Sequence, residues 1–238
     1  MRNLETTLER WPIAGTFVIS RGARRHAETI LTTISDGTHT GRSECVPYGR
    51  YGETVEGVQA AILLQRDAIA EGATRAEIAG MMSPGAALNA VDCALWDLEA
   101  KASGRSVADL TGQPLAPVTT AYTLSLGSPE SMAKAAGDAG NYPLLKLKLG
   151  GDGDPDRLRA VRAARPDARL IADANEAWDT ACIEDYLSVA AEVGVEVVEQ
   201  PLPANADEVL EGMSRPVPVC ADESAHHAGQ IADIARRY

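Results

Sequence analysis

The stretch LLKLKLGG, residues 144–151, decides the fold of this chain. An apolar run that ends in two glycines is typical of a buried strand followed by a loop. Lys146 and Lys148 are two residues apart, so on a strand they point to the same face, and the leucines point to the other. Two lysines on a buried strand are costly, so either their pKa values fall or they meet carboxylates. The alternative is a solvated edge strand that carries two surface lysines.

The second half of the chain alternates between strand-like and helix-like segments. Strands are predicted at 118–126, 144–149, 169–174, 195–200 and 217–222, and helices at 128–140, 154–165, 179–193, 204–212 and 226–237. This alternation indicates βα units and a parallel sheet, either a doubly wound sheet or part of a (β/α)8 barrel. A whole barrel needs roughly 200 residues or more, so eight units cannot close here and the chain is expected to be incomplete.

The first half has a different pattern. Three strands, expected to form an antiparallel meander, are predicted at 16–20, 27–35 and 41–46, and helices from Thr54 to Gly72, from Thr74 onward, and from Ser83-Pro84 to Gly104. Thr74 with Glu77 forms a capping-box pattern. Residues 1–115 are therefore predicted to form an α+β domain, and a linker near Pro114 and Pro117 leads to a second domain at 116–238.

Composition excludes several classes of function. The net charge of −12 argues against a nucleic-acid or anionic-membrane partner. No apolar run is long enough to span a bilayer, and the polar N-terminus does not resemble a signal peptide. The four cysteines show no paired spacing. They are interpreted as reduced thiols of a cytoplasmic protein without a zinc site.

Each strand that follows the lysine strand ends in an acidic residue. Asp173, Glu199 and Asp222 come at or just after the carboxyl ends of three successive predicted strands, the edge where parallel α/β folds bind ligands. Three carboxylates repel one another unless a cation lies among them, and an all-oxygen ligand set favours Mg²⁺. The alternative is that these residues only cap helices, a role for which Glu199 would be a poor choice.

Four short motifs follow one another along the second half of the chain: Lys146-Leu-Lys148, Asp173-Ala-Asn175, Glu199-Gln-Pro201 and Asp222-Glu223-Ser224. Together they resemble the enolase superfamily, within it the muconate-lactonizing subgroup, and most closely the dipeptide epimerases of the L-Ala-D/L-Glu type. Segments 89–98 and 122–129 are similar to that family as well. The resemblance implies a capping domain at 1–115 and, at 116–238, about five βα units of a (β/α)7β barrel.

The resemblance also implies a chemistry. Asp173, Glu199 and Asp222 would hold Mg²⁺, which clamps a substrate carboxylate and stabilises the enediolate formed when the α-proton leaves. Lys148 would be the acid/base. Lys146 would be its electrostatic neighbour, expected to help lower the pKa of Lys148 so that it can accept the proton.

Other residues receive supporting or substrate-binding roles from the resemblance. Asn175 and Glu223 would orient the metal ligands without binding the metal themselves. Arg21 and Arg24 lie in the loop at residues 20–26, where an arginine would suit an acidic substrate side chain, although a solvated basic turn explains them equally well. Further candidates for substrate binding are Tyr122 and Ser125.

One feature departs from the family pattern. Epimerisation needs a second base, which the family supplies as a lysine on the sixth barrel strand, and no lysine follows Lys148 here. The leading hypothesis is Mg²⁺-dependent epimerisation of a dipeptide such as L-Ala-L-Glu by a homo-oligomer. The alternatives are a muconate cycloisomerase or o-succinylbenzoate synthase-like enzyme, and an inactive metal-binding fragment.

Overall fold

The structure is a computed structural model that describes residues 1–238, and it divides into two compact units. The first comprises Met1–Ala14 and Arg25–Pro117, and the second comprises Gly15–Arg24 and Val118–Tyr238. The tip of the first hairpin therefore belongs with the second unit. The domain division predicted between residues 115 and 116 stays a prediction.

The first unit is a three-stranded sheet with helices packed on it. Its strands are β1 (Asn3–Ile19), β2 (Gly22–Ser35) and β3 (Thr40–Cys45), in the order β1-β2-β3, with β2 and β3 antiparallel. Helix α4 (Ala86–Ser103) packs against β3 so closely that a Cβ on Gly41 would lie 2.0 Å from the carbonyl oxygen of Ala94. Only glycine allows this close approach. Ile34, which pairs with Gly41, is buried in one hydrophobic core with residues of α4.

Several boundaries in the first unit differ from the predictions. Strand β1 is far longer than 16–20, and the helix predicted from Thr54 to Gly72 is divided into α1 (Val55–Leu63) and α2 (Arg66–Glu71). Helix α3 (Arg75–Met81) has the predicted capping box. Helix α4 begins after Gly85 rather than at Ser83-Pro84. The short elements η1 (Gly49–Tyr51) and α5 (Val107–Thr111) were not predicted, because neither contains a buried residue that would give an apolar pattern.

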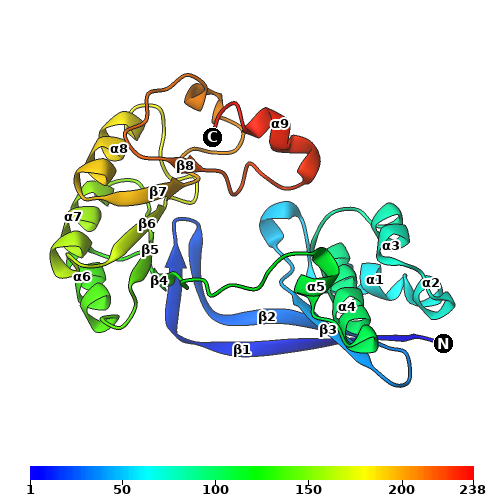
Figure 1. Ribbon diagram of the computed structural model, residues 1–238. Coiled ribbons are helices and arrows are strands. Elements are labelled where there is room, and N and C mark those ends of the chain that lie inside the picture. The colour runs from blue at the N-terminus through cyan, green and yellow to red at the C-terminus, as the bar shows by residue number, and fades with distance from the viewer. The chain divides into compact units, whose positions relative to one another are not determined.

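The second unit is an open parallel sheet with helices on one side (Figure 1). The strands follow chain order: β4 (Tyr122–Leu124), β5 (Leu144–Lys148), β6 (Arg169–Asp173), β7 (Val195–Glu199) and β8 (Val219–Cys220). The helices between them are α6 (Pro129–Asp138), α7 (Asp154–Ala164) and α8 (Ile183–Glu192). Leu145 and Leu147 of β5 are fully buried in a core with Leu158 of α7 and Leu187 of α8. The predicted α/β class with a partial barrel is confirmed.

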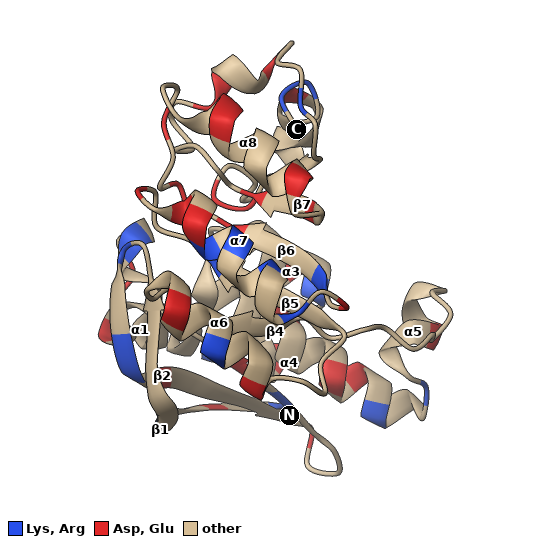
Figure 2. Ribbon diagram, turned by 90° about the vertical axis from the view of Figure 1, so that its left-hand side faces the viewer, with Lys and Arg blue, Asp and Glu red and all other residues tan.

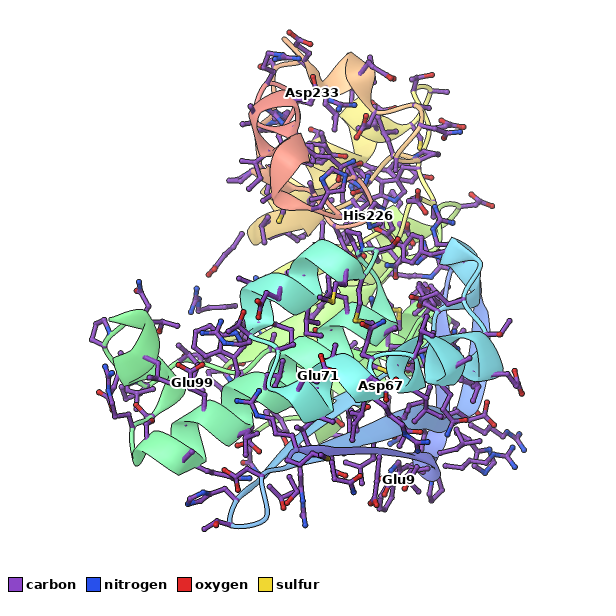
Figure 3. All side chains as sticks on the ribbon, turned by 90° about the vertical axis from the view of Figure 1, so that its right-hand side faces the viewer. Glu9, Asp67, Glu71, Glu99, His226 and Asp233 are labelled. Carbon is purple, nitrogen blue, oxygen red and sulfur yellow. The ribbon has the colours of Figure 1, made fainter.

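The last two predicted helices are largely absent. Segment 204–212 forms only the 3₁₀ turn η2 (Glu208–Leu210), and segment 226–237 forms η3 (Ala228–Gln230) and the short α9 (Ile231–Ile234). In these segments Leu210 and Ile234 are the buried aliphatic residues, so little apolar packing is available to stabilise a longer helix. Figure 3 shows His226 and Asp233 on this part of the chain.

The outer surfaces of the helices are charged. Acidic and basic positions are interspersed along α6 and α7 (Figure 2). In the first unit, Figure 3 shows Asp67 and Glu71 on α2 and Glu99 on α4. None of the helices combines the length and the apolar character that crossing a membrane requires.

Candidate active site

The register of the parallel sheet brings the predicted site residues into one row. Lys148 pairs with Asp173, Asp173 pairs with Glu199, and Glu199 pairs with Cys220. Asp222 follows two residues after Cys220. The four paired residues are the last residues of β5 to β8, so the row lies at the carboxyl ends of these strands. Side chains of paired residues on neighbouring strands also project to the same side of the sheet.

Both lysines of β5 meet carboxylates. The Nζ atom of Lys146 donates to the two carboxylate oxygens of Glu199 at 2.8 and 2.7 Å, and it lies 3.0 Å from Oδ2 of Asp173. The Nζ atom of Lys148 donates to Oδ2 of Asp173 and to Oδ1 of Asn175, the latter at 3.0 Å. Burial lowers the pKa of Lys146, but the hydrogen bonds and negative charges of Glu199 and Asp173 outweigh burial and raise it. The second of the two expectations for these lysines is thus confirmed.

The three carboxylates experience different electrostatic environments. Burial raises the pKa of Asp173, but the hydrogen bond from Lys148 and the charges of both lysines hold it below its usual value. The pKa of Glu199 is raised by burial and by the charges of Asp173 and Asp222, despite the bond from Lys146. The pKa of Asp222 is raised by partial desolvation and by the neighbouring charges of Glu223 and Asp173. The ionised form is therefore less favoured at Glu199 and Asp222 than at Asp173.

Asn175 links the lysine end of the site to Glu223. Its Oδ1 accepts from Lys148, and its Nδ2 donates to Oε1 of the buried Glu223 at 3.2 Å. Its backbone N–H donates to Oδ1 of Asp173 at 3.0 Å. Asn175, Glu176 and Gln200 all have positive φ angles, of 43°, 66° and 34°. Non-glycine residues in this region are strained, and such strain gathers at functional sites.

Arg21 reaches the same cluster from the tip of the β1–β2 hairpin. It donates to the carbonyl of Asn175 at 2.8 Å and forms ion pairs with Glu176 at 3.2 Å and Glu223 at 2.7 Å. The hydroxyl of Ser20 also donates to the carbonyl of Asn175, at 3.0 Å. The hairpin tip is thereby anchored to the loop that follows β6.

The structure places the remaining substrate-binding candidates differently from one another. Arg24 is exposed near the start of β2. Tyr122 pairs with Leu145 in the sheet, so it shares the face opposite to the lysines, where it stacks on Tyr142 with ring centroids 4.2 Å apart. Ser125 comes directly after β4, and strand alternation places it on the lysine side. The structure therefore brings Arg21 to the cluster and directs Tyr122 away from it.

Sequence reasoning missed two residues of the site. Glu176 pairs with Arg21, and Gln200, which is fully buried, accepts from the backbone N–H of Asp222 at 2.9 Å. The signal for Gln200 was present, because it stands beside Glu199 in a quoted motif, but it was interpreted only as part of that motif. No sequence pattern indicates the contact between Glu176 and the hairpin.

The chemistry of the donors fits a hard divalent cation. Asp173, Glu199 and Asp222 offer only oxygen, which Mg²⁺ prefers. Burial raises the pKa values of Glu199 and Asp222, and the charges of the neighbouring carboxylates raise them further. As placed, no group of three acidic, histidine or cysteine side chains is close enough to hold a metal by itself. The ammonium of Lys146 instead bonds to both Asp173 and Glu199.

Comparisons with known proteins identify the family of the chain. Residues 1–112 match the family model of the mandelate racemase / muconate lactonizing enzyme N-terminal domain, and residues 130–237 match that of the enolase C-terminal domain-like family. The L-Ala-D/L-Glu epimerase of Escherichia coli (strain K12) is 40% identical over 241 residues, covering 100% of this chain and 75% of the relative. The chain belongs to the mandelate racemase/muconate lactonizing enzyme group of the enolase superfamily.

Further relatives extend the comparison. The N-acetyl-D-glutamate racemase of a Pseudoalteromonas species is 35% identical, over 88% of this chain and 67% of the relative. A crystal structure of an enolase family member from Agrobacterium tumefaciens, with homology to dipeptide epimerases and with bound sodium and L-Ala-L-Glu, is 52% identical with a TM-score of 0.96. It covers 100% of this chain and 73% of that chain. A dipeptide epimerase from Enterococcus faecalis V583, complexed with Mg and L-Leu-L-Tyr, is 26% identical with a TM-score of 0.90, covering 98% and 71%.

Proposed function

We propose that this chain carries out Mg²⁺-dependent proton transfer at the α-carbon of an N-acylated glutamate, with the dipeptide L-Ala-L-Glu as the leading substrate. The observation that carries the proposal is the row at the strand ends, where the ammonium of Lys148 bonds to Asp173 beside Glu199. A base next to a cluster of metal-ligating carboxylates is the arrangement that abstracts a proton next to a carboxylate. The relatives named above support the reaction type.

Asp173, Glu199 and Asp222 are the residues that would hold the metal. When bound there, Mg²⁺ would neutralise the substrate carboxylate and stabilise the charge that develops as the α-proton leaves. Asn175 orients Asp173 through its backbone N–H, and Glu223 in turn accepts from the side chain of Asn175. The ligands are thus supported by neighbours that fix their orientation.

Lys148 is proposed to move the proton. Its side chain is mostly buried, and Asp173 and Asn175 hold its Nζ atom in a defined place. In its neutral form Nζ can take the α-proton, and in its charged form it can return it to the same face. The ammonium of Lys146 is proposed to balance the negative charges of Glu199 and Asp173 while Lys148 changes its protonation state.

Inversion needs a second base on the opposite face of the α-carbon. Lys146 lies on the same strand and face as Lys148, so it is not placed to serve as that base. Lys148 by itself supports exchange of the α-proton on one face of the α-carbon. Epimerisation is proposed to use a second base that acts on the opposite face.

The substrate proposal rests on what the relatives share. The two curated relatives are named for L-Ala-D/L-Glu and for N-acetyl-D-glutamate, and in both molecules a glutamate carries an acyl group on its nitrogen. N-acetylglutamate is accordingly the second candidate substrate. The two differ in the α-ammonium group that only the dipeptide carries.

The test is proton exchange and epimerisation measured side by side. The protein, with its mass verified, is incubated in D₂O with Mg²⁺ and either L-Ala-L-Glu or N-acetylglutamate, and the products are analysed by NMR and chiral chromatography. Deuterium at the glutamate α-carbon supports the proposal, and its stereochemistry reports whether a second base is present. The absence of exchange with both substrates would overturn the proposal.

We further propose a cytoplasmic location and assembly into a homo-oligomer. All four cysteines are free thiols, as expected in a reducing compartment. The sheet order leaves β4 and β8 at the edges of the second unit, and open edges favour association. Light scattering coupled to size-exclusion chromatography tests the assembly, and a mass equal to that of one chain would contradict it.

A further inference from the structure

The side chain of Gln200 connects the ends of β7 and β8. It is fully buried, and its Oε1 atom accepts from the backbone N–H groups of Asp222 at 2.9 Å and Ser224 at 3.0 Å. The backbone N–H of Gln200 also donates to the carbonyl of Cys220 at 2.9 Å. One residue therefore holds the loop that carries Asp222 by three hydrogen bonds, and its chain neighbour is Glu199.

The amide nitrogen of Gln200 also has hydrogen-bond partners among side-chain and backbone oxygens. Its Nε2 atom lies within donor distance of the carbonyl of Leu202 at 2.8 Å, the hydroxyl of Ser224 at 2.9 Å and the hydroxyl of Tyr238 at 2.8 Å. Because Oε1 faces only N–H groups and Nε2 faces oxygens, the amide can lie in just one orientation. Reversing it would place acceptor against acceptor at Leu202 and donor against donor at Asp222.

A buried carboxylate fixes the hydroxyl of Ser224. Ser224 donates to Oδ2 of Asp207 at 2.6 Å, and Asp207 is itself fully buried and paired with Arg237. Since the hydroxyl proton of Ser224 points to Asp207, its oxygen is left to accept from Gln200. The chain of bonds from Asp207 through Ser224 to Gln200 thus has a single polarity.

The backbone at Gln200 is held in an unfavourable conformation. Its φ angle of 34° lies in the left-handed region, which is unfavourable for a residue with a side chain. Such a conformation persists only when the surroundings fix it, and here the bonds of the side chain do so. The conformation carries the side chain from the end of β7 to the loop after β8.

On the basis of the proposed metal site, we propose that Gln200 is a positioning residue that sets the placement of the Asp222 carboxylate relative to that of Glu199, and so controls metal affinity. It touches neither metal nor substrate in this role. Residues that orient metal ligands typically contribute about 10- to 100-fold to metal affinity.

The test measures metal binding rather than turnover. Mg²⁺ and Mn²⁺ affinities are determined by calorimetry on the full chain, well below the unfolding temperature, for the wild type, Gln200→Met, Ser224→Ala and Ser224→Thr. Gln200→Met is expected to weaken binding about tenfold or more. Ser224→Ala is expected to weaken it less, and Ser224→Thr, which keeps the hydroxyl, is expected to restore it.

Arg165→Met is the matched control. Arg165 is a buried side chain of the same unit that donates to the carbonyls of Ala139 at 2.9 Å and Tyr142 at 3.0 Å. It lies in the loop before β6, at the opposite end of that strand from Asp173. Its loss is expected to lower the unfolding temperature and to leave metal affinity within about twofold. This separates a general loss of stability from misplacement of the ligands.

The outcomes distinguish the inference from the proposed function. If the wild type binds neither metal, the proposed metal site fails and the inference fails with it. If the wild type binds metal and Gln200→Met binds equally well, only the inference is overturned. If Gln200→Met does not fold, the comparison of Ser224→Ala with Ser224→Thr decides, and equal affinities for those two variants overturn the inference.

Discussion

The ammonium of Lys146 bonds to both oxygens of the Glu199 carboxylate, at 2.8 and 2.7 Å. Glu199 lies 53 positions later in the sequence, on the strand next but one to β5. The side chain of Lys146 thus reaches across β6, where it also meets Asp173 at 3.0 Å. This places a positive charge among the carboxylates proposed to bind Mg²⁺.

Replacing Lys146 is expected to make stability depend on the metal. Lys146→Met removes the positive charge between Asp173 and Glu199, and should lower the free energy of unfolding by about 1 to 3 kcal/mol in EDTA. Added Mg²⁺ should restore part of this loss. Urea unfolding with and without Mg²⁺ measures the change in the free energy of unfolding. Lys134→Met, at an exposed position of α6, is the control. Equal stabilisation of Lys146→Met and the wild type by Mg²⁺ would contradict the expectation.

Asp222→Asn is expected to raise stability in the absence of metal while it abolishes metal binding. The raised pKa of Asp222 means that its charged form is disfavoured in the folded state. The wild type and the variant should be equally stable below the ordinary pKa of an aspartate. The advantage of the variant should appear as the pH rises through the interval between the ordinary and the raised pKa, and stay constant above it.

Thermal unfolding across pH 3 to 8 in EDTA checks this, and Asp138→Asn on the exposed face of α6 is the control. If the difference in stability between Asp222→Asn and the wild type already has its full size at the lowest pH, the charge of Asp222 is not its cause.

Arg21 is expected to act by anchoring the hairpin rather than by reading the substrate side chain. Its guanidinium is already paired with Glu223 and Glu176. Arg21→Met should therefore lower exchange at the α-carbon about equally for L-Ala-L-Glu and L-Ala-L-Gln. It should also speed amide hydrogen exchange at residues 16–24.

Arg24→Met is the matched control, because Arg24 is an exposed arginine of the same hairpin, and both exchange rates should change little. A loss confined to L-Ala-L-Glu would instead assign Arg21 to the acidic side chain of the substrate.

Asp154 is expected to be the most sensitive structural carboxylate of the second unit. It is fully buried and accepts from the N–H groups of Gly150 and Gly151, from Trp178 and from Arg157. Asp154→Asn replaces an acceptor by a donor and should cost about 2 to 4 kcal/mol of unfolding free energy. Urea unfolding measures this, with the exposed Asp152 changed to Asn as the control, and a cost below about 1 kcal/mol would contradict it.

The sequence was sufficient to predict the parallel sheet and the row at the strand ends. Alternation in LLKLKLGG places Lys146 and Lys148 on one face, and the acids that end the following strands occupy the same edge by topology alone. Such predictions succeed because strand periodicity and parallel order are local or nearly local properties.

What the sequence could not show depends on contacts between distant segments. Arg21 meets Glu223, 202 positions away, and no local pattern encodes that pairing. The alternation of strand and helix segments predicts helices at 204–212 and 226–237, but little apolar packing is available to them beyond Leu210 and Ile234. Tyr122 was assigned to the site by resemblance, although its pairing with Leu145 turns it to the helix face.

The proposed role of Lys148 is tested by α-proton exchange in D₂O with Mg²⁺ and L-Ala-L-Glu, comparing the wild type with Lys148→Met and Lys134→Met. Deuterium is expected to enter the glutamate α-position with the wild type and with Lys134→Met. The exchange rate is expected to fall by about 10²-fold or more with Lys148→Met. Exchange that is unchanged in Lys148→Met, or absent from the wild type, would show that Lys148 does not move the α-proton.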